Sequence, residues 1–114
     1  MAHAETNNYI YIMKKLDKEI KKNGFTYKQI ERTPTTALYA QYTNAGQLAG
    51  HEVFHIKTIK ERVMFGMVIP AHEKFPSDRD FGITAWSVGI DETHALKRFK
   101  EITNLAKKRK TGSV

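Results

Sequence analysis

The sequence predicts an α+β fold: an antiparallel sheet of four to five strands, flanked by an N-terminal and a C-terminal helix that both pack on one face. Three observations support this prediction. Residues 8–22 and the segment after Asp91 repeat apolar side chains at helical spacing, whereas residues 25–69 and 81–88 alternate apolar and polar side chains as strands do. No helical segment separates the predicted strands, so the crossover that a parallel sheet requires is missing.

The first predicted helix, residues 8–22, has two distinct faces. At 100° per residue its apolar side chains share one side, and its lysines centre on the other side with Tyr11 among them. Asn23 and Gly24 follow, and glycine suits the left-handed position that ends a helix. The apolar side consists of Tyr9, Ile12, Met13, Leu16 and Ile20, and the lysine side of Lys14, Lys15, Lys18, Lys21 and Lys22.

Turn signals divide the predicted strands. Thr33-Pro34-Thr35 is a turn, residues 44–50 form a loop, and residues 70–80 form a long loop with two prolines. Gly66, inside an apolar run, indicates a bulge or a close neighbour. The five expected strands are residues 25–32, 37–42, 51–60, 62–69 and 81–88.

The second predicted helix begins after Asp91, which is a suitable N-cap residue. Its apolar side faces the sheet, and we expect the chain to leave the core near Lys108. The 114 residues therefore predict a single domain, with residues 1–7 and 109–114 as flexible ends. The apolar side consists of Ala95, Leu96, Phe99, Ile102, Thr103 and Ala106.

The segment His51-Glu52-Val53-Phe54-His55 matches the HExxH pattern of zinc hydrolases, in which a helix brings both imidazoles to one ion. On a strand the two residues would stand about 13 Å apart, too far to share a metal. The β-branched and aromatic content favours a strand, with both histidines on its less buried face. His72 or Glu73 offers only a loose third ligand. We therefore expect no catalytic residues, no metal and no cofactor, and keep a small zinc hydrolase as a remote alternative.

Trp86 lies in the most distinctive aromatic cluster of the chain, close to Phe81. We expect both rings to fill the core between sheet and helix. The alternative is an exposed Trp86 that anchors a partner. The neighbouring segment Ser77-Asp78-Arg79-Asp80 has carboxylates that could hold a divalent ion, but no second acidic cluster is near it in the sequence.

The formal net charge of +7 is the second functional signal. Clustered lysines suit a phosphate backbone and give binding that depends on salt and little on sequence, and Tyr11 could stack on a base. The alternative is an ordinary solvated helix face. A protein that mimics DNA is excluded, because it would be acidic. The predicted nucleic-acid-binding residues are Tyr11, Lys14, Lys18, Lys21, Lys22, Lys97, Lys100, Lys107, Lys108, Arg109 and Lys110.

The absence of cysteine excludes disulfides, thiolate metal sites and a cysteine nucleophile, and it fits a reducing cytoplasmic compartment. The longest apolar run, residues 64–70, is far shorter than a membrane span. The first residues have no basic segment followed by an apolar one, as a secretion signal would. We therefore expect a cytoplasmic protein with no membrane partner.

The strings GHEVFHIK and KFPSDRDFG-x-x-AW, followed by Ala95 and Phe99, resemble a pattern in small uncharacterised bacteriophage proteins. The resemblance covers residues 50–102 and implies a phage-type accessory protein in the host cytoplasm or the virion, with no enzymatic activity. Our first hypothesis is thus a non-enzymatic protein that binds single- or double-stranded nucleic acid non-specifically. The second is a protein-interaction module, a virion component or an inhibitor of a host protein, which could also form homo-oligomers through edge strands.

Overall fold

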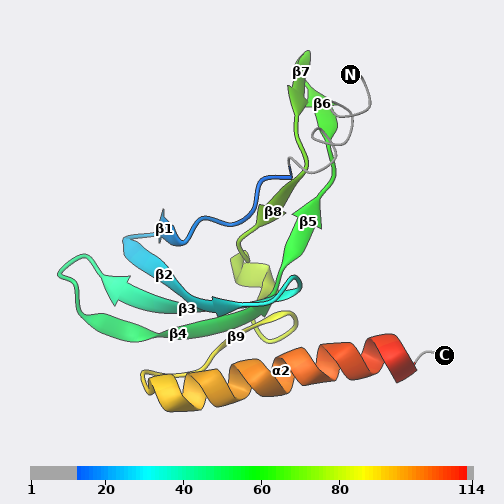
Figure 1. Ribbon diagram of the computed structural model, residues 1–114. Coiled ribbons are helices and arrows are strands. Elements are labelled where there is room, and N and C mark those ends of the chain that lie inside the picture. The colour runs from blue at the N-terminus through cyan, green and yellow to red at the C-terminus, as the bar shows by residue number, and fades with distance from the viewer. Residues whose placement is uncertain (1–12, 113–114) are drawn as a thin grey trace, which may run out of the picture. The chain divides into compact units, whose positions relative to one another are not determined.

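The computed structural model describes residues 13–112, with the side chains of residues 13–105. The chain divides into two compact units (Figure 1). One comprises Lys57–Phe75 and the segment that ends at Leu16; the other comprises Asp17–Ile56 and the segment that begins at Pro76. The larger unit contains the main sheet and the helix.

The larger unit is built on a five-stranded antiparallel sheet in the order β1-β2-β3-β4-β9. The expected α+β class and antiparallel sheet are therefore confirmed, although the strands that make up the sheet differ from those expected. The three central strands have eight residues each, whereas the two edge strands have four and three. The strands are β1 (Glu19–Lys22), β2 (Phe25–Arg32), β3 (Thr36–Thr43), β4 (Leu48–His55) and β9 (Ala85–Ser87).

The expected N-terminal helix is wrong for residues 13–22; residues 8–12 lie outside the described part of the chain. Its last residues form β1, which pairs with β2. The reason is the turn between the two strands: Asn23 and Gly24 have φ angles of 54° and 81°, the left-handed pair of a two-residue hairpin. Asn-Gly between strands is a strong hairpin signal, and here it prevails over the helical spacing of the lysines.

The C-terminal helix α2 (Glu92–Gly112) confirms the second helical prediction. Asp91 caps it, since the Asp91 carboxylate accepts a hydrogen bond of 3.0 Å from the Thr93 backbone N–H. The helix contacts β3 and β4 and packs on one face of the sheet (Figure 1). The core there consists of Leu38, Val53, Val88, Ala95, Phe99 and Ile102, with Ile30, Trp86 and Leu96 packed against it.

Both faces of β3 and β4 are buried, so the expected half-buried alternation is wrong in the centre of the sheet. All residues from Thr36 to Ala40 and from Gly50 to Phe54 are buried. On the face opposite α2, Tyr39 and Phe54 stack with ring centroids 5.6 Å apart. No second α-helix covers this face in the described chain. Figure 1 shows instead the short helix η1 (Asp78–Asp80) on this side.

Residues 70–88, expected to form one long loop and a fifth strand, contain several shorter elements in the structure. In the larger unit, Asp80 is buried and its carboxylate accepts a hydrogen bond of 2.9 Å from the Ser77 backbone N–H. The Asp80 carboxylate therefore forms a hydrogen bond within its own turn. The following strand, β9, has only three residues, because a turn with Gly82 at φ 88° precedes it.

The smaller unit is a pair of two-stranded ladders in series (Figure 1). The predicted strand 51–60 breaks after β4, and its last residues form β5 in this unit. The predicted strand 62–69 is itself a hairpin: Gly66 belongs to its turn, not to a bulge. The strands are β5 (Lys57–Ile59), paired with β8 (His72–Lys74), and β6 (Arg62–Met64), paired with β7 (Met67–Ile69).

Candidate nucleic-acid interface

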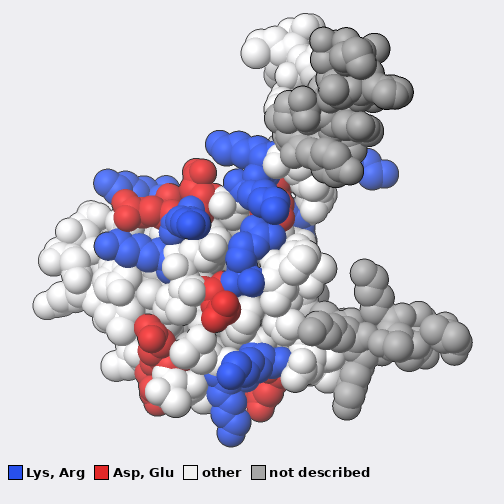
Figure 2. Space-filling model, in the orientation of Figure 1, with Lys and Arg blue, Asp and Glu red and all other residues white. Residues whose placement is uncertain are grey.

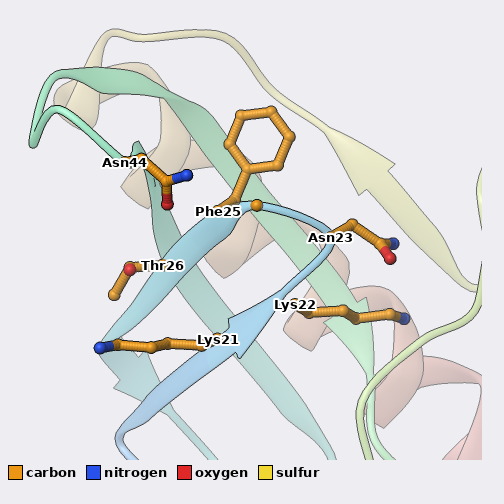
Figure 3. A pocket seen from close by; sticks show the side chains of 7 residues that line it. Lys21, Lys22, Asn23, Phe25, Thr26 and Asn44 are labelled. Carbon is orange, nitrogen blue, oxygen red and sulfur yellow. The ribbon is translucent and has the colours of Figure 1, made fainter.

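The lysines predicted to share one helix face do not share a helix in the observed fold. Lys14 belongs to the smaller unit, whereas Lys18, Lys21 and Lys22 belong to the larger one. On β1 successive side chains point to opposite sides of the sheet, so Lys21 and Lys22 diverge (Figure 3). The Lys22 ammonium donates a hydrogen bond of 2.8 Å to the Pro76 carbonyl, which directs it to the face opposite α2.

Of the other predicted binding residues, the side chains of two are described. Lys97 and Lys100 are exposed on α2. The backbone of α2 extends through residues 107–110, whose side chains lie outside the described set, as does Tyr11 as a whole. Figure 2 shows basic side chains in several groups on the face in view, with acidic side chains among them.

One group of these lysines does border a concave surface. Two open hollows of about 350 and 330 Å³ adjoin each other on the β1–β2 hairpin and share Lys21, Thr26 and Asn44. Such volumes are at the small end of the range for ligand-binding clefts. The first hollow is lined by Lys21, Lys22, Asn23, Gly24, Phe25, Thr26 and Asn44, and the second by Glu19, Lys21, Thr26, Lys28, Tyr42, Thr43, Asn44 and Gly46.

Strand register explains why these side chains meet. Lys21 pairs with Thr26, and Thr26 pairs with Tyr42, so the three side chains lie on one face across three strands. Lys28 is two residues further along β2 on the same face, and its ammonium lies 5.3 Å from the centroid of the Tyr42 ring. Two ammonium groups and an aromatic face are thereby brought together, and the Lys28–Tyr42 pair is a cation–π arrangement.

Sequence reasoning identified Lys21 but missed Lys28 and Tyr42. They lie 14 residues apart in the chain, and only the β2–β3 pairing brings them together. The Asn23-Gly24 turn could have indicated this: taken as a hairpin, it sets Lys21 opposite Thr26. Glu19, the one acidic residue lining the two hollows, pairs with Lys28 across β1 and β2.

The HExxH segment lies on β4, which confirms that it is extended. His51 and Glu52 therefore point to opposite faces of the sheet, and the described chain contains no group of three metal-ligating side chains. The placement of both histidines on a less buried face is wrong for His51, which is 1% exposed. Its Nδ1 lies 2.9 Å from the Gly89 carbonyl, and because a carbonyl only accepts, Nδ1 donates.

The prediction that Trp86 and Phe81 both fill the core between sheet and helix is confirmed for Trp86 only. Trp86 packs against the core beneath α2 and meets His55 edge-on, with ring centroids 5.5 Å apart. Phe81, in contrast, is only half-buried and lies outside that core cluster.

Glu52 is a buried carboxyl that sequence reasoning considered only as part of a zinc motif. Burial raises the pKa of Glu52 to about 7; Lys22 opposes this shift and Asp78 reinforces it. Among the described residues, Glu52 Oε1 has no hydrogen-bond partner. Burial also raises the pKa of Tyr27, and the neighbouring Glu52 charge adds to that effect.

Comparisons with known proteins match no family model, no curated protein and no solved structure. Among the described residues, no helix has both the length and the hydrophobicity needed to cross a bilayer. The residues around the two hollows are therefore the basis for the functional proposal.

Proposed function

We propose that the chain is a non-enzymatic protein that binds single-stranded nucleic acid with little sequence preference, through the surface formed by Lys21, Thr26, Lys28 and Tyr42. The observation that carries the proposal is the juxtaposition of two ammonium groups with an aromatic ring beside two open hollows. Ammonium groups attract phosphates, and an aromatic face beside them offers a stacking platform for a base.

This surface favours a single strand over a duplex. A duplex stacks its bases inside, whereas a single strand can place a base against an aromatic ring while its phosphates meet the lysines. The surface has only two exposed lysines and one acidic neighbour, so the expected binding is weak and strongly dependent on salt. The surrounding charge of +7 would raise the rate of encounter with the polyanion.

The test is a salt titration of binding to a fluorescein-labelled oligothymidine, followed by anisotropy from about 50 to about 200 mM salt. We expect the double variant Lys21→Gln/Lys28→Gln to bind more weakly. The slope of log K against log salt should become shallower by about 1.4, because each phosphate that a lysine no longer neutralises removes about 0.7 from it. Tyr42→Leu should weaken binding with the slope unchanged, because stacking releases no counterions.

The matched control is Lys97→Gln/Lys100→Gln, which removes the same charge from exposed positions on α2. If the control reduces the slope as much as the β-strand variant, binding is diffuse and the proposed surface is wrong. Glu19→Gln provides a test of opposite sign: it removes the carboxylate beside Lys28 and should tighten binding. Absence of any binding at about 50 mM salt would refute the function itself.

A further inference from the structure

The β6–β7 hairpin of the smaller unit exposes a concentration of large apolar side chains. Phe65, at its turn, is 95% exposed, and Val63, Met67 and Val68 are each more than 60% exposed. Met64 is 37% exposed. Scattered apolar residues on a surface need no explanation, but five exposed apolar side chains within six consecutive residues at one hairpin indicate contact with an apolar environment.

The apolar residues occupy both faces of the hairpin. Val63 pairs with Val68, and Met64 pairs with Met67; adjacent pairs in a two-stranded ladder point to opposite sides. A hairpin that docks in a protein groove buries one face and leaves the other in water, so that face is polar. Apolar side chains on both faces and at the turn fit a medium that surrounds the hairpin on all sides.

The turn itself places Phe65 at the end of the hairpin. Phe65 and Gly66 have φ angles of 52° and 75°, the left-handed pair that a two-residue turn requires. Asn or Gly adopts the first of these positions more easily than an aromatic residue does. The most exposed apolar side chain of the hairpin therefore stands where a small polar residue would form the turn better.

Basic residues follow where the apolar ones end. Lys60 and Arg62 on one side of the hairpin and Lys74 on β8 are all exposed. Acidic residues are fewer in Lys57–Phe75: Glu61 and Glu73, of which the Glu73 Oε1 accepts a hydrogen bond of 2.9 Å from the Leu16 backbone N–H. The unit thus has an apolar end bordered by a segment with a net positive charge.

The length of the apolar end of the hairpin matches the depth to which interfacial segments enter a bilayer. The turn and two residue pairs extend about 7–10 Å at 3.3–3.4 Å per residue. Apolar faces of interfacial segments enter the boundary of headgroups and acyl chains to about 5–10 Å. At that depth Arg62 and Lys60 would lie at the level of the lipid phosphates, where cationic side chains are attracted to an anionic surface.

We propose that the β6–β7 hairpin inserts its apolar end into the interface of an anionic lipid bilayer, with Lys60 and Arg62 against the headgroups. The hairpin stays at the surface, since its apolar length is far below the roughly 9–11 residues per strand of a transmembrane β-strand. The chemistry that recognises the membrane is the combination of a small apolar wedge with adjacent cations. This proposal departs from the sequence-based expectation of no membrane partner. It is separate from oligonucleotide binding and concerns the smaller unit.

The test measures partitioning of the full chain onto extruded vesicles of phosphatidylcholine alone and of phosphatidylcholine with phosphatidylglycerol, by cosedimentation. Phe65→Asn is the main variant, because asparagine suits the left-handed turn and so removes the ring without disrupting the hairpin. We expect it to lower the partition coefficient onto anionic vesicles at least about tenfold. Ile83→Asn, which removes a similarly exposed apolar side chain in the other unit, should have no effect.

Lys60→Gln/Arg62→Gln should abolish the preference for anionic vesicles while weak binding to neutral ones remains. Equal effects of Phe65→Asn and Ile83→Asn, or no partitioning of the unmodified chain, would overturn the proposal. Sedimentation velocity without lipid identifies a competing occupant: an oligomer that Phe65→Asn dissociates means that the hairpin binds a second copy instead. Unchanged oligothymidine binding by Phe65→Asn would keep failure here distinct from failure of the nucleic-acid proposal.

Discussion

Replacing Glu52 by glutamine tests whether the fold holds this carboxyl in its neutral form. The side chain is 6% exposed on β4, and burial raises its pKa from 4.5 to about 7. Lys22 limits the increase, and Asp78 adds to it. The folded protein therefore keeps a proton that the unfolded chain loses at lower pH.

The sign and size of the effect on stability follow from the difference between the Glu52 pKa in the folded and unfolded states. Between pH 4.5 and about 7 the unfolded state binds fewer protons than the folded state at this position, so stability falls as the pH rises. Each pH unit costs up to about 1.36 kcal/mol, and the interval of about 2.5 units gives a loss of at most about 3 kcal/mol. Above about pH 7 the carboxyl is ionised in both states, and its contribution stays constant.

Glu52→Gln should remove this loss because glutamine does not titrate. We expect the variant and the unmodified protein to have similar free energies of unfolding near pH 4.5, and the variant to be more stable at about pH 8 by up to about 3 kcal/mol. Urea denaturation followed by Trp86 fluorescence measures both. Glu31→Gln, at an exposed position on β2, is the control. Parallel pH profiles for Glu52→Gln and the unmodified protein would refute the reasoning.

Two further substitutions test the fold of the larger unit by the same denaturation assay. Phe99→Ala should destabilise it by about 3–5 kcal/mol, because the ring is buried between α2 and the sheet. The control Lys100→Ala, at an exposed position, should have little effect. Equal effects of the two substitutions would mean that the core lies elsewhere. Gly24→Ala should lower the free energy of unfolding by about 1 kcal/mol. Nothing lies within 4 Å of the added Cβ, so only the φ of 81° opposes the substitution. An unchanged free energy of unfolding would mean that the hairpin turn is not formed.

The sequence predicted the segments whose local signals agree with one another. β2 was predicted with the observed bounds, and α2 with its N-cap, because a turn or a cap coincides there with a change of period. The extended HExxH segment was predicted from its β-branched and aromatic residues, which favour a strand. In each case the local features of the segment favoured one structure.

The N-terminal segment failed because its signals conflict. Lysines at helical spacing also fit a short strand, and Asn23-Gly24 fits either a helix end or a hairpin. The pairing with β2 decides between them, and that pairing is a tertiary interaction that no local window contains. The candidate site was missed for the same reason, since Lys28 and Tyr42 join Lys21 only through the registers of three strands.

The lengths of the sheet's outer strands limit what could extend it. β1 and β9 have four and three residues, against eight in each inner strand. A foreign segment that aligned along either margin would gain only a few backbone hydrogen bonds, too few to compensate for ordering itself. Strand addition at β1 or β9 is therefore an unfavourable route by which the larger unit could recruit another polypeptide.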